Sequence, residues 1–471
     1  MDLLHLQDRH SQVMIVPSST STRPRPVNRS VGMGRMELKK QSNPPVVLQE
    51  DLNSQYWTSS SKLLAMSFVF AGLVALATFK TSGAQNTDSS NPTLGSLPPQ
   101  SVLVDPRSFS VIGQNGTFRA SSFEGFFNPT STTPPFFQIF DQEFLKVLGA
   151  SPSLTEIASN PGFAFAHEAP IYVPETDELF FASNDGGPLG MSDLDHNNEV
   201  SKISMAEVEA ALARKSSSPI NVTVTPLNLS DTIQMTNGGT GPFRSQLLLV
   251  NSGRGPLPPN IALVNPRPPF NSTIILDNFF GRQFNSLNDV KIHPSGKIFF
   301  TDVTYGFLNN FRPAPLIPNQ VYRLDPDTRA LRVVADGFDK CNGIAFTADG
   351  NTAYISDTGA TGGNSTQTEP STVYAFDVDP VSHAFKNRRV LAYVDAGVPD
   401  GIQVDTHGNV YSGTGDGVQT WNSEGTLLGK FFLGTTSANM VFAGKGRLVI
   451  LAETKIFLAK IAAEGFDLGG N

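Results

Sequence analysis

Three stretches of the chain share one alternation of apolar and polar positions: a short apolar run, a tight turn and a second apolar run. They begin at Asn288, Asn342 and Asp400. Alternation with a period of two over so few residues predicts two β-strands joined by a turn. In each stretch the polar residue stands the same distance ahead of a turn glycine, and these glycines are Gly296, Gly350 and Gly408. The three stretches begin about 55 residues apart, a spacing typical of propeller blades.

The rest of residues 101–471 repeats this pattern less clearly. The expected elements are a strand in 101–112, a helix in 141–148, two strands joined by a turn in 168–184, a helix inserted between strands in 203–215, strands in 243–251 and 260–265, and a last pair of strands in 439–460. These segments amount to about six repeating units. With four strands in each unit, they predict an all-β, six-bladed β-propeller. A β-sandwich is the alternative, but it does not explain the shared phase of the three stretches.

The N-terminal region differs from the rest. Residues 1–62 are polar, rich in Ser and Pro and without a sustained apolar period, so a disordered tail is expected. Residues 63–79 form an unbroken apolar run that predicts one apolar helix. The favoured interpretation is a transmembrane signal-anchor that leaves the propeller outside the cytoplasm, and the other is the h-region of a signal peptide cleaved near Ala84, which gives a secreted protein. Residues 80–100 are typical of a linker.

Both interpretations send residues 101–471 into the secretory pathway. Five Asn-X-Ser/Thr sequences agree with this and mark glycosylation candidates, although such tripeptides also arise by chance. They are Asn115, Asn221, Asn228, Asn271 and Asn364.

The net charge of −8 is unevenly distributed. Residues 1–62 carry eight Lys and Arg against five Asp and Glu, which leaves −11 on the remaining residues. An acidic body argues against nucleic-acid binding and suits divalent cations. Cys341 is the only cysteine, so an intrachain disulfide is excluded, and we interpret it as a small buried residue.

The repeated polar positions carry the candidate chemistry. The innermost strand of each blade lines the central channel of a propeller, so residues at one phase of that strand form a ring at one height. Asn288, Asn342 and Asp400 share this phase, and Glu168 heads its own unit at the matching position. Two carboxylates and two amide oxygens form a cage that suits Ca²⁺ better than Mg²⁺, because Ca²⁺ tolerates irregular geometry. The alternative is that Asn-Gly and Asp-Gly are ordinary turn dipeptides.

A cation with open positions would polarise a carbonyl group and hold a water. Asp400 is then the candidate general base, or less favourably a nucleophile, and hydrolysis of an ester or lactone is the simplest function. His167 could orient a ligand, although a packed core histidine is an equal alternative. Tyr305, in a loop expected to line the pocket, is a second candidate for substrate binding. The other two histidines of note, His293 and His407, fall at turns where exposure is expected.

Four separated motifs resemble those of a known family. They are HEAPIYVPETDELFF, NSLNDVKIHPSGKIFFTDVTYG, CNGIAFTADGNTAYISDTG and GVPDGIQVDTHGNVYSGTGDGVQTW. They are similar, in the same order, to the blade motifs of the calcium-dependent gluconolactonase and regucalcin-like propellers, over roughly residues 101–471. The preceding FQIFDQEFLKVLGASPSLTEIA resembles the fungal lactonohydrolases more closely than other members.

The resemblance implies a six-bladed propeller with a catalytic divalent ion. By motif, Glu168, Asn342 and Asp400 match direct ligands, and Asn288 matches a residue that binds the ion directly or through water. Asp400 also matches the catalytic base or nucleophile. The chain departs from the family at Cys341, where a larger or Pro-like residue is expected, and in its N-terminal anchor.

The leading hypothesis is therefore an extracytoplasmic, Ca²⁺-dependent lactonase that opens a sugar lactone or a related lactone. A phosphotriesterase-like hydrolase could use the same site. A propeller without enzymatic activity, binding calcium or a partner, is the third hypothesis.

Overall fold

A computed structural model describes residues 96–123, 125–214, 219–362 and 366–466. The expected tail (1–62), the apolar helix (63–79) and most of the linker (80–100) lie outside these ranges. None of the helices within these ranges has the length and apolar character that crossing a bilayer requires.

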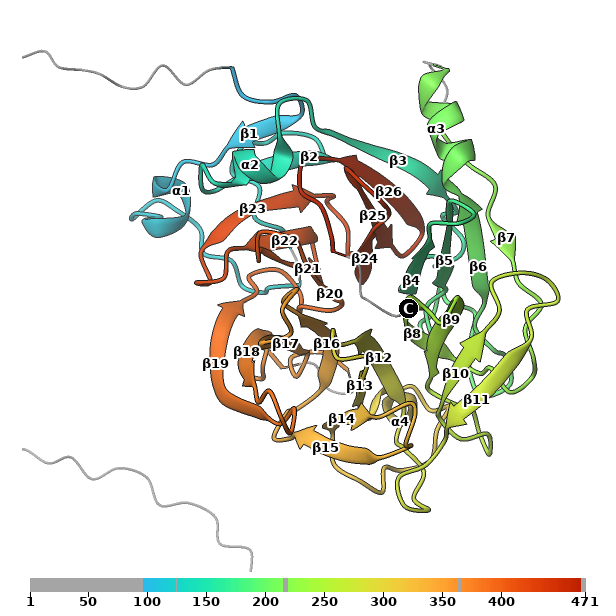
Figure 1. Cartoon of the computed structure of the whole chain (residues 1–471). Coiled ribbons are helices and arrows are strands. Elements are labelled where there is room, and N and C mark those ends of the chain that lie inside the picture. The colour runs from blue at the N-terminus through green and yellow to red at the C-terminus, as the bar shows by residue number, and fades with distance from the viewer. Residues whose placement is uncertain (1–95, 124, 215–218, 363–365, 467–471) are drawn as a thin grey trace, which may run out of the picture. The chain divides into compact units, whose positions relative to one another are not determined.

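Six β-sheets surround one centre (Figure 1). The inner strand of each sheet contacts the inner strand of the next, and the last contacts the first, so the ring is closed. In chain order these inner strands are β4 (Glu168–Val173), β8 (Thr236–Phe243), β12 (Leu287–Ile292), β16 (Cys341–Phe346), β20 (Ile402–Val404) and β24 (Asn439–Phe442). The predicted six-bladed propeller is confirmed, and we number its blades 1 to 6 by these strands.

The outer strands follow in sequence within each blade. Blade 1 adds β5 (Glu178–Ala182), β6 (Val200–Ser204) and β7 (Thr225–Pro226), and blade 2 adds β9 (Gln246–Asn251), β10 (Asn260–Val264) and β11 (Ser272–Leu276). Blade 3 adds β13 (Ile298–Asp302), β14 (Gln320–Leu324) and β15 (Leu331–Ala335), and blade 4 adds β17 (Thr352–Asp357), β18 (Thr372–Val378) and β19 (Phe385–Tyr393). Blade 5 adds β21 (Val410–Thr414), β22 (Gly417–Trp421) and β23 (Leu427–Phe432), and blade 6 adds β25 (Arg447–Ala452) and β26 (Lys455–Lys460).

The segment ahead of blade 1 completes the last two sheets. β3 (Ser153–Ser159) pairs antiparallel with β26 and supplies the fourth strand of blade 6. β2 (Phe136–Ile139) pairs antiparallel with β23, and β1 (Ser101–Leu103) pairs parallel with β2, so both extend blade 5. Pairing strands from both ends of the propeller closes the ring with backbone hydrogen bonds and covers sheet edges that would otherwise be exposed.

The helices are short. They are α1 (Arg107–Ser110), α2 (Phe144–Leu148), α3 (Met205–Ala213) and α4 (Tyr305–Leu308). The expected helices in 141–148 and 203–215 are confirmed as α2 and α3. α3 begins after Ser204, whose side chain accepts a hydrogen bond from the backbone of Glu207 and caps the helix. The expected strand in 101–112 is wrong beyond Leu103, because α1 follows.

Apolar side chains fill the space between the blades. All five residues of β13 are buried, because each face of its sheet packs against a neighbouring blade. This explains why the sequence there shows a continuous apolar run rather than strict alternation. Aromatic rings supply much of the packing: those of Phe300 and Tyr322 stack with centroids 5.3 Å apart. Burying one such side chain contributes about 1.5–3 kcal/mol.

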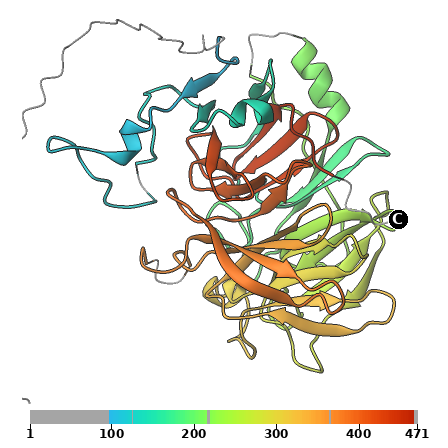
Figure 2. The same cartoon turned by 60° about the vertical axis from the view of Figure 1, so that its left-hand side comes forward.

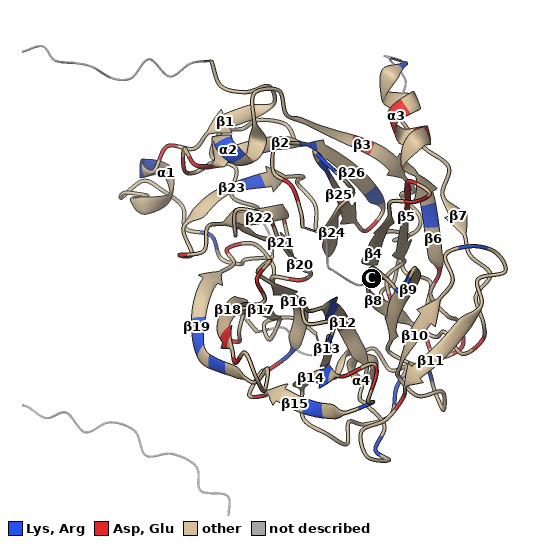
Figure 3. Ribbon diagram, viewed as in Figure 1, with Lys and Arg blue, Asp and Glu red and all other residues tan. Residues whose placement is uncertain are grey.

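Charged residues of both signs are interspersed along the outer strands and loops (Figure 3). Some form ion pairs, such as Lys202 with Glu178 and Lys455 with Glu156. Fully exposed ion pairs contribute only about 0.2–1 kcal/mol each, and these two pairs are partly buried.

Candidate metal and active site

A β-bulge at the start of three inner strands positions three of the predicted ligands. The pairing register shifts within residues 168–171 of β4, 287–290 of β12 and 341–344 of β16. Each bulged segment contains one predicted ligand, namely Glu168, Asn288 or Asn342. Bulges re-aim side chains and are frequent beside active sites. Asn288 and Asn342 occupy the same position in their bulges, and Glu168 stands one residue earlier in its own.

The glycines after Asn342 and Asp400 permit close approach between blades. A Cβ atom on Gly343 would lie 2.3 Å from the carbonyl oxygen of Asp400, and one on Gly401 would lie 2.2 Å from the side chain of Asn439. Neither glycine has a positive φ. The interpretation as turn residues is wrong for Asn342 and Gly343, which lie within β16, whereas Asp400 and Gly401 lie in a bend just before β20. In both places a glycine allows neighbouring inner strands to approach closely.

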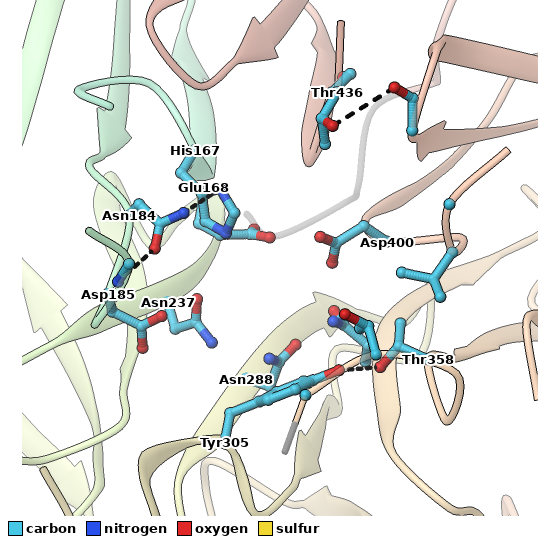
Figure 4. A pocket seen from close by; sticks show the side chains of 18 of the residues that line it. His167, Glu168, Asn184, Asp185, Asn237, Asn288, Tyr305, Thr358, Asp400 and Thr436 are labelled. Carbon is cyan, nitrogen blue, oxygen red and sulfur yellow. Dashed lines mark hydrogen bonds between the residues drawn. The ribbon is translucent and has the colours of Figure 1, made fainter. Parts of the chain in front are cut away.

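The four predicted ligands line one pocket of about 390 Å³. The carboxylates of Glu168 and Asp400 face each other across it, and the amide of Asn288 points into it (Figure 4). One ligand atom each from His167, Glu168 and Asp400 lie within 4.8 Å of one another. The structure thus brings together the side chains that the repeats placed at one phase.

Two oxygens of this group lack hydrogen-bond partners. Asn288 Oδ1 and Asp400 Oδ1 are buried and accept no hydrogen bond within the described part of the chain. Leaving a buried acceptor unsatisfied costs about 1–3 kcal/mol, so such atoms commonly contact a water or an ion. Amide and carboxylate oxygens are the ligands that hard divalent cations take. The residues present therefore fit such a cation.

The pKa shifts of the pocket carboxyl groups also agree with a site for a divalent cation. Burial and the nearby Asp400 raise the pKa of Glu168 well above its usual range. Burial also raises the pKa of Asp400 to about 7, although the charge of His167 opposes this. Two buried carboxylates resist ionising together because like charges repel strongly in a low dielectric. A bound cation would offset that repulsion.

His167 lies at the pocket and is held by a carboxylate. Its Nδ1 atom is 2.7 Å from Oε1 of Glu453, and Asn184 Nδ2 donates to Oε2 of Glu453 at 3.1 Å. Burial acts to lower the pKa of His167, but Glu453 more than reverses this and the pKa rises to about 10. Because Nδ1 is engaged, Nε2 is the nitrogen left to donate to a ligand. His167 lines the pocket, and its role in substrate binding stays a prediction.

Tyr305 also lines the pocket, at the start of α4. Its hydroxyl shares a hydrogen bond with the hydroxyl of Thr358 (Figure 4). Burial raises the pKa of Tyr305 above its usual range, so the phenol stays protonated and can donate or accept. The structure puts Tyr305 where a substrate would contact it, and that contact stays a prediction.

Sequence reasoning missed several residues of the site. Asn439, the first residue of the last expected pair of strands, donates from Nδ2 to Oε2 of Glu168 at 2.7 Å. Asp185 lines the pocket, and burial raises its pKa to about 7. Asp185 offered no comparable signal, because it lies three residues beyond the end of β5, whereas Asp302 is the last residue of β13. Glu453 offered no signal, because it lies within the last expected pair of strands (439–460), in the turn between β25 and β26, and not at the repeated polar position.

The expectations about the exposure of three further residues have clear outcomes. Cys341 is fully buried, as predicted. The prediction that His293 is exposed is wrong: it is buried between blades, with Nε2 2.9 Å from the carbonyl oxygen of Gly350 and its ring against Phe346. His407 is exposed as expected.

The candidate glycosylation sites within the described ranges are exposed. They are Asn115, Asn221, Asn228 and Asn271. Asn364 lies outside those ranges. Exposure is compatible with modification but is common for Asn, so glycosylation stays a prediction.

Named relatives are similar to most of the propeller. The lactonohydrolase oryL of Aspergillus oryzae is 29% identical in an alignment of 354 residues that covers 70% of this chain and 76% of the relative. A gluconolactonase of Zymomonas mobilis is 31% identical in an alignment of 191 residues that covers 38% of this chain and 51% of the relative. These names agree with the class of enzyme that the motifs imply.

A solved structure shares the fold. That of a gluconolactonase from Xanthomonas campestris superposes with a TM-score of 0.54 at 24% identity, covering 69% of this chain and 94% of that one. Residues 167–453 match the family described as the SMP-30/Gluconolactonase/LRE-like region. Because this match spans well over half of the chain, the protein belongs to the SMP-30/gluconolactonase family.

Proposed function

We propose that the protein is a lactone hydrolase that depends on a divalent cation, with Ca²⁺ as the favoured ion. The observation that carries this proposal is the convergence of Glu168, Asn288, Asn342 and Asp400 on one pocket, with buried oxygens that have no partner in the described chain. The names of the relatives support a lactone as the substrate.

The four converging side chains would hold the cation. When bound, it would polarise the lactone carbonyl and stabilise the negative charge that develops on its oxygen. His167 Nε2 and the Tyr305 hydroxyl would orient the ring of the substrate from the pocket wall. Holding the substrate beside the catalytic groups makes the reaction effectively unimolecular, which lowers the entropic part of its barrier.

Asp400 would act as the general base. Its carboxylate takes one proton from a water as the water oxygen attacks the carbonyl carbon. The bond between the carbonyl carbon and the ring oxygen then breaks, and the proton passes to that ring oxygen. The product is the open hydroxy acid, so one lactone and one water are consumed for each product.

Chelation tests the proposal. The full chain is dialysed against EGTA and assayed with D-glucono-1,5-lactone, pantolactone and a phosphotriester, before and after Ca²⁺ is restored. We expect lactone hydrolysis to disappear and to return with Ca²⁺. Asp400→Asn should lower kcat about 10²–10⁴-fold, as loss of a general base does, whereas Asp195→Asn, at an exposed position away from the pocket, should not.

Each other outcome counts against a part of the proposal. Hydrolysis that persists after chelation would reject the role of the cation. Turnover of the phosphotriester alone would reject the lactone as substrate. Cation binding without any turnover would favour a propeller that is not an enzyme.

A further inference from the structure

Side chains of opposite character line the two sides of the pocket. Blades 1 and 2 contribute polar side chains, among them Asn184, Asp185 and Asn237, which lie together in Figure 4. Three apolar side chains come from elsewhere: Val398 precedes Asp400 in the approach to blade 5, and Phe123 and Phe126 belong to the segment ahead of blade 1. The apolar wall therefore comes largely from outside the blades.

Two hydrogen-bond anchors hold that segment, which we call the strap and define as residues 119–123 and 125–128. Before the phenylalanines, the backbone N–H and the hydroxyl of Ser122 both donate to Gln367 Oε1, at 3.0 and 2.7 Å. The carbonyl oxygen of Ser122 accepts from the backbone N–H of Gly397 at 2.8 Å. After them, Gln138 Nε2, buried in β2, donates to the carbonyl oxygen of Phe127 at 3.1 Å.

An ion pair strengthens the first anchor. Arg119 Nη1 lies 3.2 Å from Oδ2 of Asp395, whose other oxygen lies 2.7 Å from Nζ of the buried Lys430. Figures 1 and 2 show this N-terminal segment, in blue, beside the strands of blade 5. Because Gly397 adjoins Val398 and is three residues from Asp400, these contacts fix the strap on the Asp400 side of the pocket.

The strap is separate from the part of the chain that matches the family. That match begins at residue 167, whereas the strap ends at residue 128. The family region thus supplies the cation ligands and the polar wall. The strap supplies the two aromatic side chains, which are partly exposed and so able to contact a ligand.

We propose that Phe123 and Phe126 determine substrate specificity, by selecting lactones whose ring carries a hydrocarbon substituent. The lactone ring would lie at the oxygen cage with its substituent on the strap, and polar groups of the substrate would face Asn184, Asp185 and Asn237. This inference rests on the proposed lactone hydrolysis for its substrate. Each methylene moved from water onto an apolar surface favours binding about 4-fold, so a pentyl chain that contacts the wall should give a preference of about 10-fold or more.

A matched pair of substrates tests the inference with the full chain. δ-Decalactone and δ-valerolactone share a six-membered ring and differ by a pentyl chain. The measured quantity is the ratio of their kcat/KM values. In the wild type we expect this ratio to favour δ-decalactone about 10-fold or more. In Phe123→Ala/Phe126→Ala it should fall to near one.

Two further variants test whether the change in ratio comes from the two phenylalanines and from their position. Phe118→Ala removes a nearby phenylalanine that is 76% exposed and does not line this pocket, so its ratio should equal that of the wild type. Gln367→Ala removes the acceptor for Ser122 but leaves both phenylalanines, so the ratio should fall part of the way. Thermal unfolding of each variant verifies that the propeller is intact.

Binding of non-hydrolysable lactams separates the two proposals. The lactams that correspond to the two lactones are titrated into the Ca²⁺-loaded protein by calorimetry. If no lactone is hydrolysed but the pentyl lactam binds more tightly than the plain lactam, and only while both phenylalanines are present, the proposed function fails and the strap inference holds. The strap inference would be overturned if the wild type showed no preference for the pentyl-substituted ligand. It would also be overturned if Phe123→Ala/Phe126→Ala kept that preference.

Discussion

The Nδ1 atom of His167 lies 2.7 Å from Oε1 of Glu453, although the two residues are 286 positions apart in the chain. The backbone N–H of Ala166 donates to the carbonyl oxygen of Glu453 at 3.0 Å beside this contact. His167 precedes β4 and Glu453 follows β25, so the contact joins the first and last blades at the pocket. One pair thus contributes to closure of the ring and holds a residue of the pocket.

Glu453→Gln should lower both the stability of the propeller and its activity. The amide keeps the size of the side chain but removes the charge that holds the imidazolium of His167, and a hydrogen bond to a charged group contributes about 1.5–3 kcal/mol. We expect a loss of unfolding free energy in that range, measured by urea denaturation, and a fall of about 10-fold in kcat/KM. Glu175→Gln, at an exposed turn, is the control. A Glu453→Gln protein with wild-type activity would show that the pair is only incidental.

Gly343→Ala should destabilise the propeller at the site. The added methyl group would lie 2.3 Å from the carbonyl oxygen of Asp400, so β16 must move away from the approach to β20. Overpacking of this kind typically costs about 1–3 kcal/mol. Gly162→Ala is the control, because its methyl group would meet its nearest neighbour at 3.7 Å. Equal unfolding midpoints for the two variants would contradict the close approach of the strands.

Asp177 should make the stability depend on pH. It accepts hydrogen bonds from the Tyr172 hydroxyl at 2.8 Å and from Arg447 Nη2 at 2.7 Å, and so links blade 1 to blade 6. Burial acts to raise the pKa of Asp177, but the hydrogen bonds from Arg447 and Tyr172 lower it below its ordinary value. The ionised form therefore adds stability above the pKa of the unfolded chain, about 3.9, and that stability is lost as the pH falls through the lower folded value.

The measurement for Asp177 is the unfolding free energy of the wild type and of Asp177→Asn from pH 7 downwards. Because the side chain is 36% exposed, we expect a difference of only about 0.5–1 kcal/mol near neutral pH. The difference should shrink below about pH 4, where the carboxylate gains a proton. A difference that does not change with pH would assign the effect to packing.

The N-terminal residues allow a separate prediction. We propose that residues 63–79 carry the propeller across a membrane, which would expose Asn115, Asn221, Asn228 and Asn271 to glycosylation. In yeast cells the full chain should sediment with membranes, and an endoglycosidase should increase its mobility on a gel. A chain without residues 1–84 should show neither effect. Full chain that is soluble and unaffected by the enzyme would contradict this topology.

The candidate site could be predicted from the sequence because three of its residues recur at one phase of the repeats. Asn288, Asn342 and Asp400 stand eight residues before a turn glycine, and the structure gives the first two the same bulge in their strands. Repetition is a local property of the chain, so it can be recognised without coordinates. The prediction of a six-bladed propeller depended on the same repetition.

The inner strand of blade 2 was missed for a physical reason. β8 has the sequence TNGGTGPF, whose glycines and proline are typical of a loop. A Cβ atom on Gly238 would lie 2.3 Å from the carbonyl oxygen of Asn288, so glycine is required there by the adjacent strand. His293 was misjudged for a similar reason, because its turn packs against blade 4. Contacts between blades, like the pair of His167 and Glu453, leave no periodic trace in the sequence.

Calcium binding measured by calorimetry tests the central claim most directly. After treatment with EGTA, the full chain is titrated with Ca²⁺, beside Glu168→Gln, Asp400→Asn and the control Asp195→Asn. We predict one ion per chain for the wild type and the control, and binding weakened at least about 10-fold in each site variant, because each removes a charged ligand. Binding of equal affinity in all four proteins, or none in the wild type, would contradict the account.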